Sequence, residues 1–209
     1  MKKILLTLMV FGIVGCSKEI PSDQLVGRNG IYYEVNSQTP FSGRVVSYHE
    51  NGQLQSKRNY KDGCLEGLQE SYYENGQLEE KGIYKDIMDI PMFCSNQLDY
   101  GFYDGPYESY YKNGQLKKKE NYKDGIIEDG PVEEYFSNGQ LSWGRNYKDG
   151  TYDGLSESYH ANGQLEEKRN YKDGIIEDGP VESYHHNGQL NRRDCYKNGK
   201  KVDMSYCEK

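Results

Sequence analysis

Four histidines are the side chains of this sequence best suited to acid–base or metal chemistry: His49, His160, His185 and His186. Three of them follow a tyrosine in one position of a repeated unit, where other copies have Tyr73, Tyr111 and Phe136. A position that also accepts phenylalanine is defined by packing rather than by proton transfer. Adjacent residues of a strand point to opposite faces, so His185 and His186 are not expected to share a metal ion. We therefore predict no catalytic histidine and no metal site.

Aspartate and glutamate, together 33 residues, are the other candidates for catalysis. Glu128 and Asp129 recur in an equivalent place between copies of the unit as Glu177 and Asp178. A glycoside hydrolase needs two carboxyl groups with different pKa values in one cleft. Carboxylates repeated in register along a sheet are instead typical of turns and of a solvated surface. The sequence therefore predicts a protein that is not an enzyme and has no cofactor.

Five cysteines are present, and none of their spacings forms the Cys-x-x-Cys pair of a zinc site. Cys195 and Cys207, near the C-terminus, are the favoured disulfide pair. Cys64 and Cys94 are a second candidate pair, and free thiols are the alternative for all four residues. Both pairs fit an exported protein, because disulfides persist outside the cytoplasm.

The first fifteen residues predict export. Lys2 and Lys3 precede an apolar stretch over residues 4–14, which is too short to span a bilayer as a helix but typical of a signal peptide. The stretch runs into Cys16, and polar residues follow. This arrangement resembles the lipobox of bacterial lipoproteins. An ordinary cleaved signal with an incidental cysteine is the alternative.

The lipobox resemblance implies that the thiol of Cys16 is acylated and that cleavage makes this residue the mature N-terminus. Several acyl chains on one residue give stable attachment to a membrane. Because Ser17 rather than aspartate follows the cysteine, the resemblance implies the outer membrane if the cell is Gram-negative. We therefore expect a cell-envelope protein that is anchored in the membrane through an N-terminal lipid.

The rest of the chain is dominated by a repeat. The tetrapeptide Asn-Gly-Gln-Leu occurs six times, starting at Asn51, Asn75, Asn113, Asn138, Asn162 and Asn187. A glycine stands eight residues before each of these asparagines, and a tyrosine stands nine residues after it. Successive copies are 24 or 25 residues apart, except for a spacing of 38 between the second and third copies. Copies in such regular register indicate a repeat protein.

Two turns are expected in each unit. Asn-Gly between strand-like runs predicts a type I′ turn with a two-residue loop, because both residues accept a positive φ. In the first copy this loop would place His49 opposite Leu54 and put Tyr48 on the other face. Leu54 and Tyr60, six residues apart, would then share a face. Lys-Asp-Gly, at residues 61–63, predicts the turn that leads to the next copy.

The composition favours hairpins with a thin aromatic core, since the chain has 21 tyrosines, 24 glycines and only 34% hydrophobic residues. One hairpin buries too little surface to be stable alone, so the copies must stack. We predict an all-β fold: an elongated antiparallel β-hairpin repeat array, a single-layer β-meander of about six repeats. The predicted divisions are residues 1–15 (signal peptide), 16–40 (anchor, linker and N-terminal capping strand), 41–199 (repeats) and 200–209 (C-terminal cap).

The unit Tyr-x-x-Asn-Gly-Gln-Leu, followed by Tyr-Lys-Asp-Gly, resembles the MORN-like repeat of the MORN variant group over roughly residues 41–199. This repeat is found in many bacterial proteins catalogued as YwqK-type antitoxin components. The resemblance implies a β-sheet repeat array with a role in binding, often at membranes or with protein partners.

The longer spacing between the second and third copies reflects an insert at residues 87–99. Its apolar residues include Ile87, Met88, Ile90, Met92 and Phe93. Insertions in repeat arrays form loops that often lie on a binding face, and methionine-rich surfaces adapt to partners. We identify these five residues as the candidate partner-binding site. The alternative is that the insert folds back and covers the sheet.

A formal net charge of −7 disfavours a general nucleic-acid binder, which would need a basic surface. The export signal and the repeats instead predict a membrane-anchored lipoprotein with a non-catalytic module for protein binding or scaffolding at the cell envelope. Its partners would be the membrane, through the lipid, and an unknown protein. The two alternatives are an antitoxin or immunity-type protein that neutralises a toxin, and an envelope enzyme that acts on glycans.

Overall fold

The computed structural model describes residues 18–85 and 102–208, most of which lie in β-strands. Ahead of the first repeat lie β1 (Glu19–Pro21), the 3-10 helix η1 (Ser22–Gln24), β2 (Leu25–Arg28) and β3 (Ile31–Glu34). The repeats contain β4 (Gly43–Tyr48), β5 (Leu54–Lys61), β6 (Cys64–Tyr72), β7 (Leu78–Tyr84), β8 (Tyr103–Tyr110), β9 (Leu116–Lys123), β10 (Ile126–Ile127), β11 (Gly130–Tyr135), β12 (Leu141–Lys148), β13 (Thr151–Tyr159), β14 (Leu165–Lys172), β15 (Ile175–Ile176), β16 (Gly179–Tyr184) and β17 (Leu190–Lys197). They are followed by β18 (Lys200–Val202) and the 3-10 helix η2 (Met204–Tyr206).

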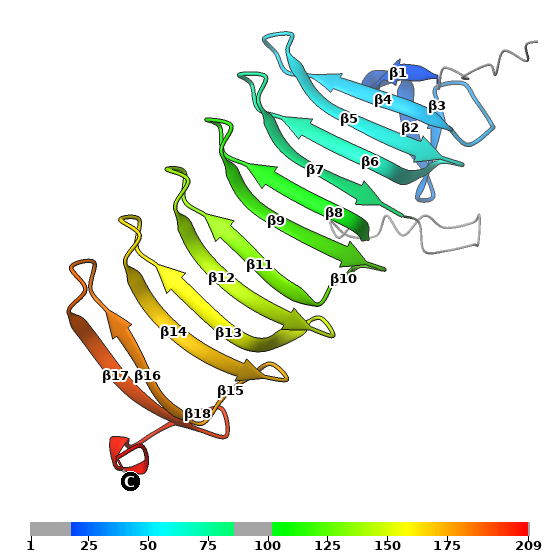
Figure 1. Cartoon of the computed structure of the whole chain (residues 1–209). Coiled ribbons are helices and arrows are strands. Elements are labelled where there is room, and N and C mark those ends of the chain that lie inside the picture. Colours follow the sequence, from blue (N-terminus) through cyan, green and yellow to red (C-terminus); the bar gives the residue numbers. More distant parts are fainter. Residues whose placement is uncertain (1–17, 86–101, 209) are drawn as a thin grey trace, which may run out of the picture.

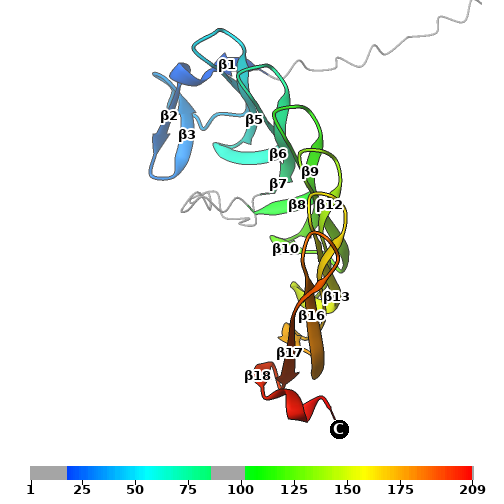
Figure 2. The ribbon, with the colours of Figure 1, turned by 90° about the vertical axis from the view of Figure 1, so that its left-hand side faces the viewer.

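The repeat strands form one long sheet in chain order from β4 to β18, and neighbouring repeat strands are antiparallel (Figure 1). The short strands β10 and β15 pair with the strands that precede them, β9 and β14. β1 pairs in parallel with β4 at the N-terminal edge. Seen edge-on, the sheet is a single layer, and the separate β2–β3 hairpin lies on one side of its N-terminal end (Figure 2). The predicted all-β repeat array is confirmed.

The sheet continues directly from the second hairpin to the third. β7 pairs with β8, so that Glu80 lies opposite Ser109 and Tyr84 opposite Tyr103. The insert at residues 87–99 lies outside the described residues. The second and third hairpins are therefore joined by direct pairing of β7 with β8.

The Asn-Gly loops are not the type I′ turns that the sequence predicted. In the first hairpin φ is positive at Gly52 (82°) but not at Asn51. The N–H of Gly52 donates to the carbonyl of His49 at 2.9 Å, and the N–H of His49 donates to the carbonyl of Gln53 at 2.8 Å. The connection is therefore a three-residue loop, a β-turn followed by a left-handed glycine. The same two hydrogen bonds recur in all six Asn-Gly loops.

The longer loop changes the register of the hairpin. Tyr48 pairs with Leu54, whereas the two-residue loop would have paired His49 with Leu54. The next pair is Ser47 with Ser56, so β5 contains one extra residue, a β-bulge, directly after the loop. The same register shift occurs in each of the other repeat hairpins.

The bulge also places the leucine and the tyrosine that recur in every copy of the unit on different faces. Residues paired across an antiparallel ladder share a face, so Leu54 lies with Tyr48, and Tyr60 lies with its partner Gly43. Tyr48 and Gly43 are five residues apart on one strand and therefore point to opposite faces. The prediction that Leu54 and Tyr60 share a face was wrong, because simple alternation fails across a bulge.

Type I′ geometry occurs at the opposite end of the hairpins, in the Asp-Gly turns. Asp62 and Gly63 have φ values of 49° and 83° and connect paired residues of β5 and β6. The repeated carboxylates lie beside such turns. Asp129 Oδ1 accepts a hydrogen bond from the N–H of Asp149 at 2.8 Å, and Asp178 Oδ1 accepts one from the N–H of Asn198 at 2.6 Å. These aspartates therefore close turns.

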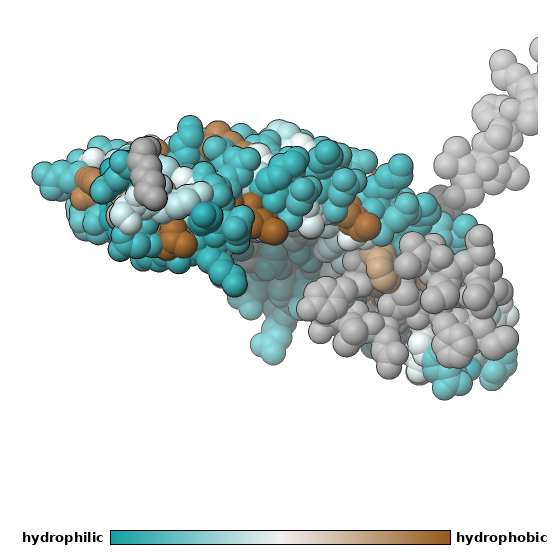
Figure 3. Space-filling model, turned by 90° about the horizontal axis from the view of Figure 1, so that it is seen from below, coloured by the Kyte–Doolittle hydropathy of each residue, from teal (hydrophilic) through white to brown (hydrophobic). Residues whose placement is uncertain are grey.

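The largest hydrophobic cluster is small and lies at the N-terminal end of the sheet. Ile20, Phe41, Val45 and Tyr60 are buried together, and the ring of Tyr32 packs edge-on against Tyr60 with centroids 5.4 Å apart. In the view of Figure 3 the surface is mostly hydrophilic, with separate apolar side chains. The capping strand predicted within residues 16–40 corresponds to β3, one strand of the hairpin that covers this end of the array.

The C-terminal end is closed by β18, η2 and a disulfide. Cys195 and Cys207, the pair favoured from the sequence, are joined with their Cα atoms 6.0 Å apart, and Cys195 is fully buried. Cys64 is buried beside Ile31. Its candidate partner Cys94 lies outside the described residues, so that pairing stays a prediction.

We expect Gly139→Val to lower the free energy of unfolding by more than about 1 kcal/mol, because β-branched residues resist positive φ. Gly139 has a φ of 84°, and an added Cβ would lie no closer than 3.4 Å to Gln115. Strain rather than collision is therefore the expected cause. Thermal and denaturant unfolding measure the loss. Gly139→Asn is the control, since asparagine tolerates this conformation; an equal loss in both variants would contradict the explanation.

Candidate functional site

One face of the sheet carries the repeat tyrosines, and we call it the tyrosine face. Its repeat tyrosines are Tyr60, Tyr84, Tyr122, Tyr147, Tyr171 and Tyr196, each opposite the glycine that begins its unit. Rings from the next strand pack against them. Tyr84 and Tyr103 have centroids 4.5 Å apart, and Tyr147 and Tyr152 have centroids 5.0 Å apart. The aromatic rings thus supply the contacts of a face on which, among the described strands, only the β2–β3 hairpin forms a second layer (Figure 2).

Burial changes the acidity of these phenols. It raises the pKa of Tyr84 and of Tyr103 above the usual range, and it raises the pKa of Tyr147 to about 12. A phenol with such a pKa stays protonated near neutral pH and is a poor general base. The tyrosine face is therefore suited to packing and to hydrogen bonding rather than to proton transfer.

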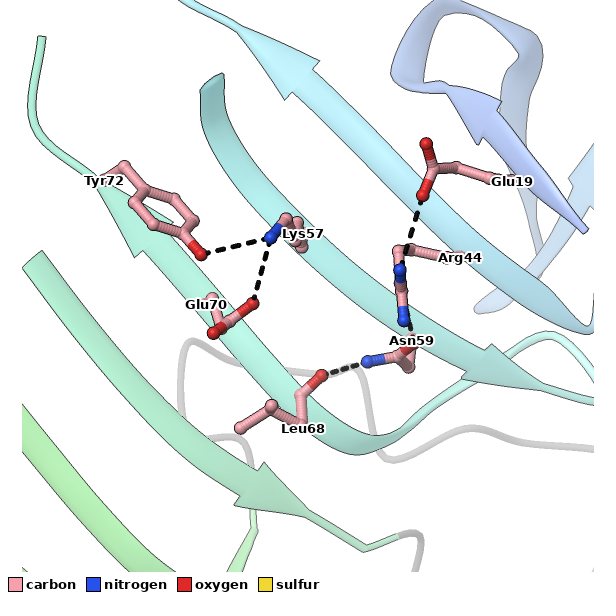
Figure 4. A network of polar contacts seen from close by, with 7 residues as sticks. All are labelled: Glu19, Arg44, Lys57, Asn59, Leu68, Glu70 and Tyr72. Atoms are coloured by element: carbon pink, nitrogen blue, oxygen red, sulfur yellow. Dashed lines mark hydrogen bonds and ion pairs between the residues drawn. The ribbon is translucent and has the colours of Figure 1, made fainter. Parts of the chain in front are cut away.

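The other face, which we call the charged face, carries Lys–Glu–Tyr clusters. Figure 4 shows the first one: Lys57 Nζ lies 3.7 Å from a carboxylate oxygen of Glu70 and donates to the hydroxyl of Tyr72 at 3.3 Å. In four later hairpins the tyrosine hydroxyl instead donates to a glutamate of its own strand, at Tyr110–Glu108, Tyr135–Glu133, Tyr159–Glu157 and Tyr184–Glu182. The charged face is therefore held together across strands by neutralised charges.

Glu108 is at the centre of the most connected of these clusters. Its carboxylate lies 2.8 Å from Lys81 Nζ and 3.3 Å from Lys119 Nζ, and it accepts a hydrogen bond from Tyr110. Hydrogen bonding by Lys81, followed by that of Tyr110, lowers its pKa to about 2. The carboxylate is therefore ionised at neutral pH and has a structural role.

The Asn-Gly loops are joined to one another by side-chain hydrogen bonds. The amide nitrogen of each loop asparagine except the last donates to a carbonyl in the next loop, at 2.6–2.8 Å: Asn51 to Glu74, Asn75 to Lys112, Asn113 to Ser137, Asn138 to Ala161 and Asn162 to His186. The asparagine oxygen accepts from the glutamine two residues later. Each of the first five asparagines thus shapes its own loop and also connects it to the next hairpin.

The histidine position forms a second row of bonds between hairpins. Four residues there contact the carbonyl of the tyrosine that ends the first strand of the next hairpin, at 2.7–2.8 Å: His49 to Tyr72, Tyr73 to Tyr110, Tyr111 to Tyr135 and His160 to Tyr184. Phe136 occupies the same position but has no polar atom. The position therefore combines packing with a hydrogen bond, which the comparison of residue types did not predict.

A shallow hollow lies over the last three hairpins, where this row meets the sheet. Its volume is about 700 Å³, and its lining includes Trp143, His160, Glu167, His185 and Arg192. The carboxylate of Glu167 forms an ion pair with Arg169 at 2.6 Å. Within residues 18–85 and 102–208 no three His, Cys, Asp or Glu side chains are grouped closely enough to hold a metal ion. The hollow offers aromatic and charged contacts for binding.

None of the site residues predicted from the sequence is among the described residues that line this hollow. Cys16 and the five apolar residues of the insert, from Ile87 to Phe93, lie outside the described residues. Cys195 and Cys207 form the disulfide of the C-terminal cap. In the described part of the chain no helix is long and apolar enough to cross a membrane.

The residues that the sequence reasoning missed are the loop asparagines, whose bonds reach the next hairpin. The Asn-Gly pattern by itself indicates only a role in the turn. A usable signal was present, because asparagine occupies this position in all six copies, although aspartate also forms such turns. An invariant amide indicates that both its donor and its acceptor are used.

Replacing Phe136 by tyrosine is expected to stabilise the array by about 1 kcal/mol, because the new hydroxyl can donate to the carbonyl of Tyr159 as Tyr111 does to Tyr135. His160→Phe should lose a similar amount, whereas His160→Tyr should be nearly neutral. Denaturant unfolding of the three variants is the measurement. Equal stabilities for His160→Tyr and His160→Phe would refute the bond.

The lowered pKa of Glu108 predicts that the free energy of unfolding decreases at acidic pH. Its pKa is lowered from 4.5 to about 2, so its stabilising effect is complete above the unfolded value and is lost as the pH falls from about 5 to 2. The melting temperature of Glu108→Gln should therefore be lower than that of the wild type at pH 7. Between pH 5 and pH 2 it should fall by less than that of the wild type. Glu74→Gln, at an exposed loop carboxylate, is the control and should follow the wild type. Parallel curves for wild type and Glu108→Gln would argue against this role.

Comparison with known proteins identifies the repeat. A family model described as MORN repeat variant matches residues 42–62, 65–86, 103–124, 152–173 and 177–198. The hairpin of β11 and β12 lies between matched segments and has the same loop hydrogen bonds as the others. Among curated proteins, none matches the chain.

One similar solved structure is the crystal structure of GtfA/B complex bound to UDP and GlcNAc. It is 13% identical over 69% of this chain and 22% of that chain, with a TM-score of 0.20. The family assignment rests instead on the repeats. Because the matched segments make up more than half of the chain and each coincides with a hairpin of the sheet, the chain belongs to the MORN repeat variant family.

Proposed function

We propose that this protein is a membrane-anchored lipoprotein whose MORN repeats form a non-catalytic module for protein binding or scaffolding at the cell envelope. The observation that carries the proposal is the single-layer sheet, which presents both faces and a row of loops along most of its length (Figures 1 and 2). Such a shape offers a long contact surface, and the hollow over the last three hairpins is shallow. Repeat arrays of this kind are suited to extended partners.

Anchoring is proposed to occur through an acylated Cys16. β1 begins at Glu19, three residues later, and three residues span at most about 10 Å. The N-terminal hairpin would then stand next to the membrane, and β17 would lie at the far end of the sheet (Figure 1). In a Gram-negative cell the membrane would be the outer membrane, since Ser17 follows the cysteine.

The insert is our candidate for the partner contact, through Ile87, Met88, Ile90, Met92 and Phe93. The pairing of β7 with β8 supports this role, because the array does not need the insert to remain continuous. An antitoxin or immunity-type function would use the same kind of contact and differs only in the partner. A glycan-cleaving enzyme is disfavoured, since the carboxylate of Glu167 in the hollow is neutralised by Arg169.

Changing Cys16 to alanine is expected to abolish labelling by an alkyne fatty acid and partition into detergent. The reason is that the acyl chains have no other proposed site of attachment. Cys207→Ala is the matched control and should keep both properties. Persistent labelling of the Cys16→Ala protein would rule out this anchor.

Deleting residues 88–98 and joining the ends with a glycine-containing turn is expected to keep the β-type circular dichroism spectrum. The melting temperature should fall by only a few degrees, because contacts between neighbouring hairpins are retained. Crosslinked partner protein should no longer be recovered from native membranes.

An equally long glycine–serine insert is the control for length. A large loss of stability with aggregation would instead mean that the insert covers the sheet. A recovered partner that is toxic when produced alone would favour the antitoxin function.

A further inference from the structure

The last hairpin of the array leaves part of an edge strand uncovered. β18 pairs with β17 only at Cys195, Tyr196 and Lys197. In the preceding hairpin, the strand that corresponds to β17 is β14, and its Glu167 and Lys168 pair with the following strand β16. The corresponding residues of β17 are Arg192 and Arg193, and within the described residues no strand lies on their outer side. Figure 1 shows β17 as the outermost long strand.

Two side chains at this edge have no following hairpin among the described residues to supply the carbonyl acceptors that their equivalents use in earlier copies. His160 contacts the carbonyl of Tyr184, and Asn162 donates to the carbonyl of His186, both in the next hairpin. The equivalent side chains of the last hairpin are His185 and Asn187. In the described part of the chain, the amide of Asn187 reaches only Gln189 of its own loop, at 3.3 Å. Two donors are therefore placed for carbonyls of an added strand.

Exposure of an apolar side chain marks the same edge. The leucine of the Asn-Gly-Gln-Leu motif is only partly exposed in the first five copies. Leu190, its equivalent in the last copy, is 53% exposed. A following hairpin is what distinguishes the first five from the last, so an added strand would cover Leu190.

The charge of the edge selects the partner. The side chains of Arg192 and Arg193 are 55% and 43% exposed. Each already has an ion pair in its own hairpin, Arg192 with Asp194 at 2.8 Å and Arg193 with Glu182 at 3.3 Å. Lys168 is likewise paired with Glu157 of its own hairpin at 3.0 Å. In the preceding interface Lys168, at the position of Arg193, lies opposite Glu182. Opposite charges across a strand pair stabilise it. An incoming strand with glutamate at this position, in the pattern Glu-Ser-Tyr of residues 182–184, would match the edge.

A second copy of this chain fits poorly. At its N-terminal end, β1 already occupies the edge of β4 from Arg44 to Val46. Val46 is the counterpart of Glu182 in the first copy, and it is 6% exposed. Pairing two C-terminal edges in the register that aligns residues 192 and 193 would bring arginines opposite arginines, which is destabilising. The complementary occupant is therefore a strand of a different protein.

We propose that β17 is a docking edge for an acidic extended segment of a partner protein, which adds to the sheet as an antiparallel strand. Carbonyls of the segment would accept from His185 and Asn187, its glutamate would face Arg193, and an apolar or aromatic residue would cover Leu190. This inference rests on the proposed binding function and deepens it by assigning the partner's chemistry. Exposed sheet edges bind peptides in this way through main-chain hydrogen bonds.

The test uses the full-length chain in detergent and a fluorescein-labelled peptide with the sequence of residues 177–187, which copies the strand that docks on β14. Fluorescence anisotropy should detect saturable binding. Arg193→Glu should weaken binding about tenfold, because an attractive pair becomes repulsive. A peptide with Glu182→Lys should bind wild type weakly and should regain affinity for Arg193→Glu. Lys112→Glu, with the same change of charge on a distant exposed loop, is the control and should bind like wild type.

Absence of binding, or binding that Arg193→Glu leaves unchanged, would overturn the docking edge. Self-association of the chain that Arg193→Glu abolishes, measured by sedimentation velocity, would replace the partner by a second copy and overturn the proposal. Both readouts are independent of Cys16 and of the insert. If the peptide does not bind but deletion of the insert removes the cellular partner, the proposed function survives and only the docking edge fails.

Discussion

Hydrogen bonds between neighbouring hairpins are the interaction on which this structure depends. A single-layer sheet has little interior, and the main buried cluster is confined to the N-terminal end around Tyr60. Each hairpin alone would expose most of its surface and would be unstable. Backbone ladders join one hairpin to the next, and the loop amides of Asn51 and its equivalents add a second connection. Stability is therefore a property of the stack, as in other repeat proteins.

This dependence explains why the two ends of the array are built differently from its middle. The N-terminal end has β1 along the edge of β4 and a hairpin packed on Tyr60. The C-terminal end has a short strand and a disulfide, which cover only the part of β17 near Cys195. Repeat arrays need such caps because the terminal units have a neighbour on one side only. The partial cover at β17 leaves the remaining positions able to bind.

Both faces show how a thin sheet tolerates polar residues. On the charged face, Glu108 is neutralised by Lys81 and Lys119, so its ionised carboxylate is stabilising. On the tyrosine face, rings such as Tyr84 and Tyr103 pack against each other. Tyrosine suits this position because the ring is apolar while the hydroxyl can meet water or a neighbouring polar group. The surface that results is amphipathic and extended.

The recurrence of Asn-Gly-Gln-Leu was enough to predict an all-β array of stacked hairpins, because periodicity and turn residues are local properties. The sequence did not reveal the loop geometry. Asn-Gly at Asn51 and Asp-Gly at Asp62 both permit a type I′ turn, yet only the second adopts it. The amide of Asn51 bonds to the next hairpin, and this contact exists only after stacking. The resulting bulge moved Leu54 away from the face of Tyr60. Local sequence therefore determined the units and their order. The three-residue loop and its bulge, which also occur in the last copy, decided the register and the faces. Stacking decided which edge stays uncovered, because an edge is covered only where a further strand pairs with it.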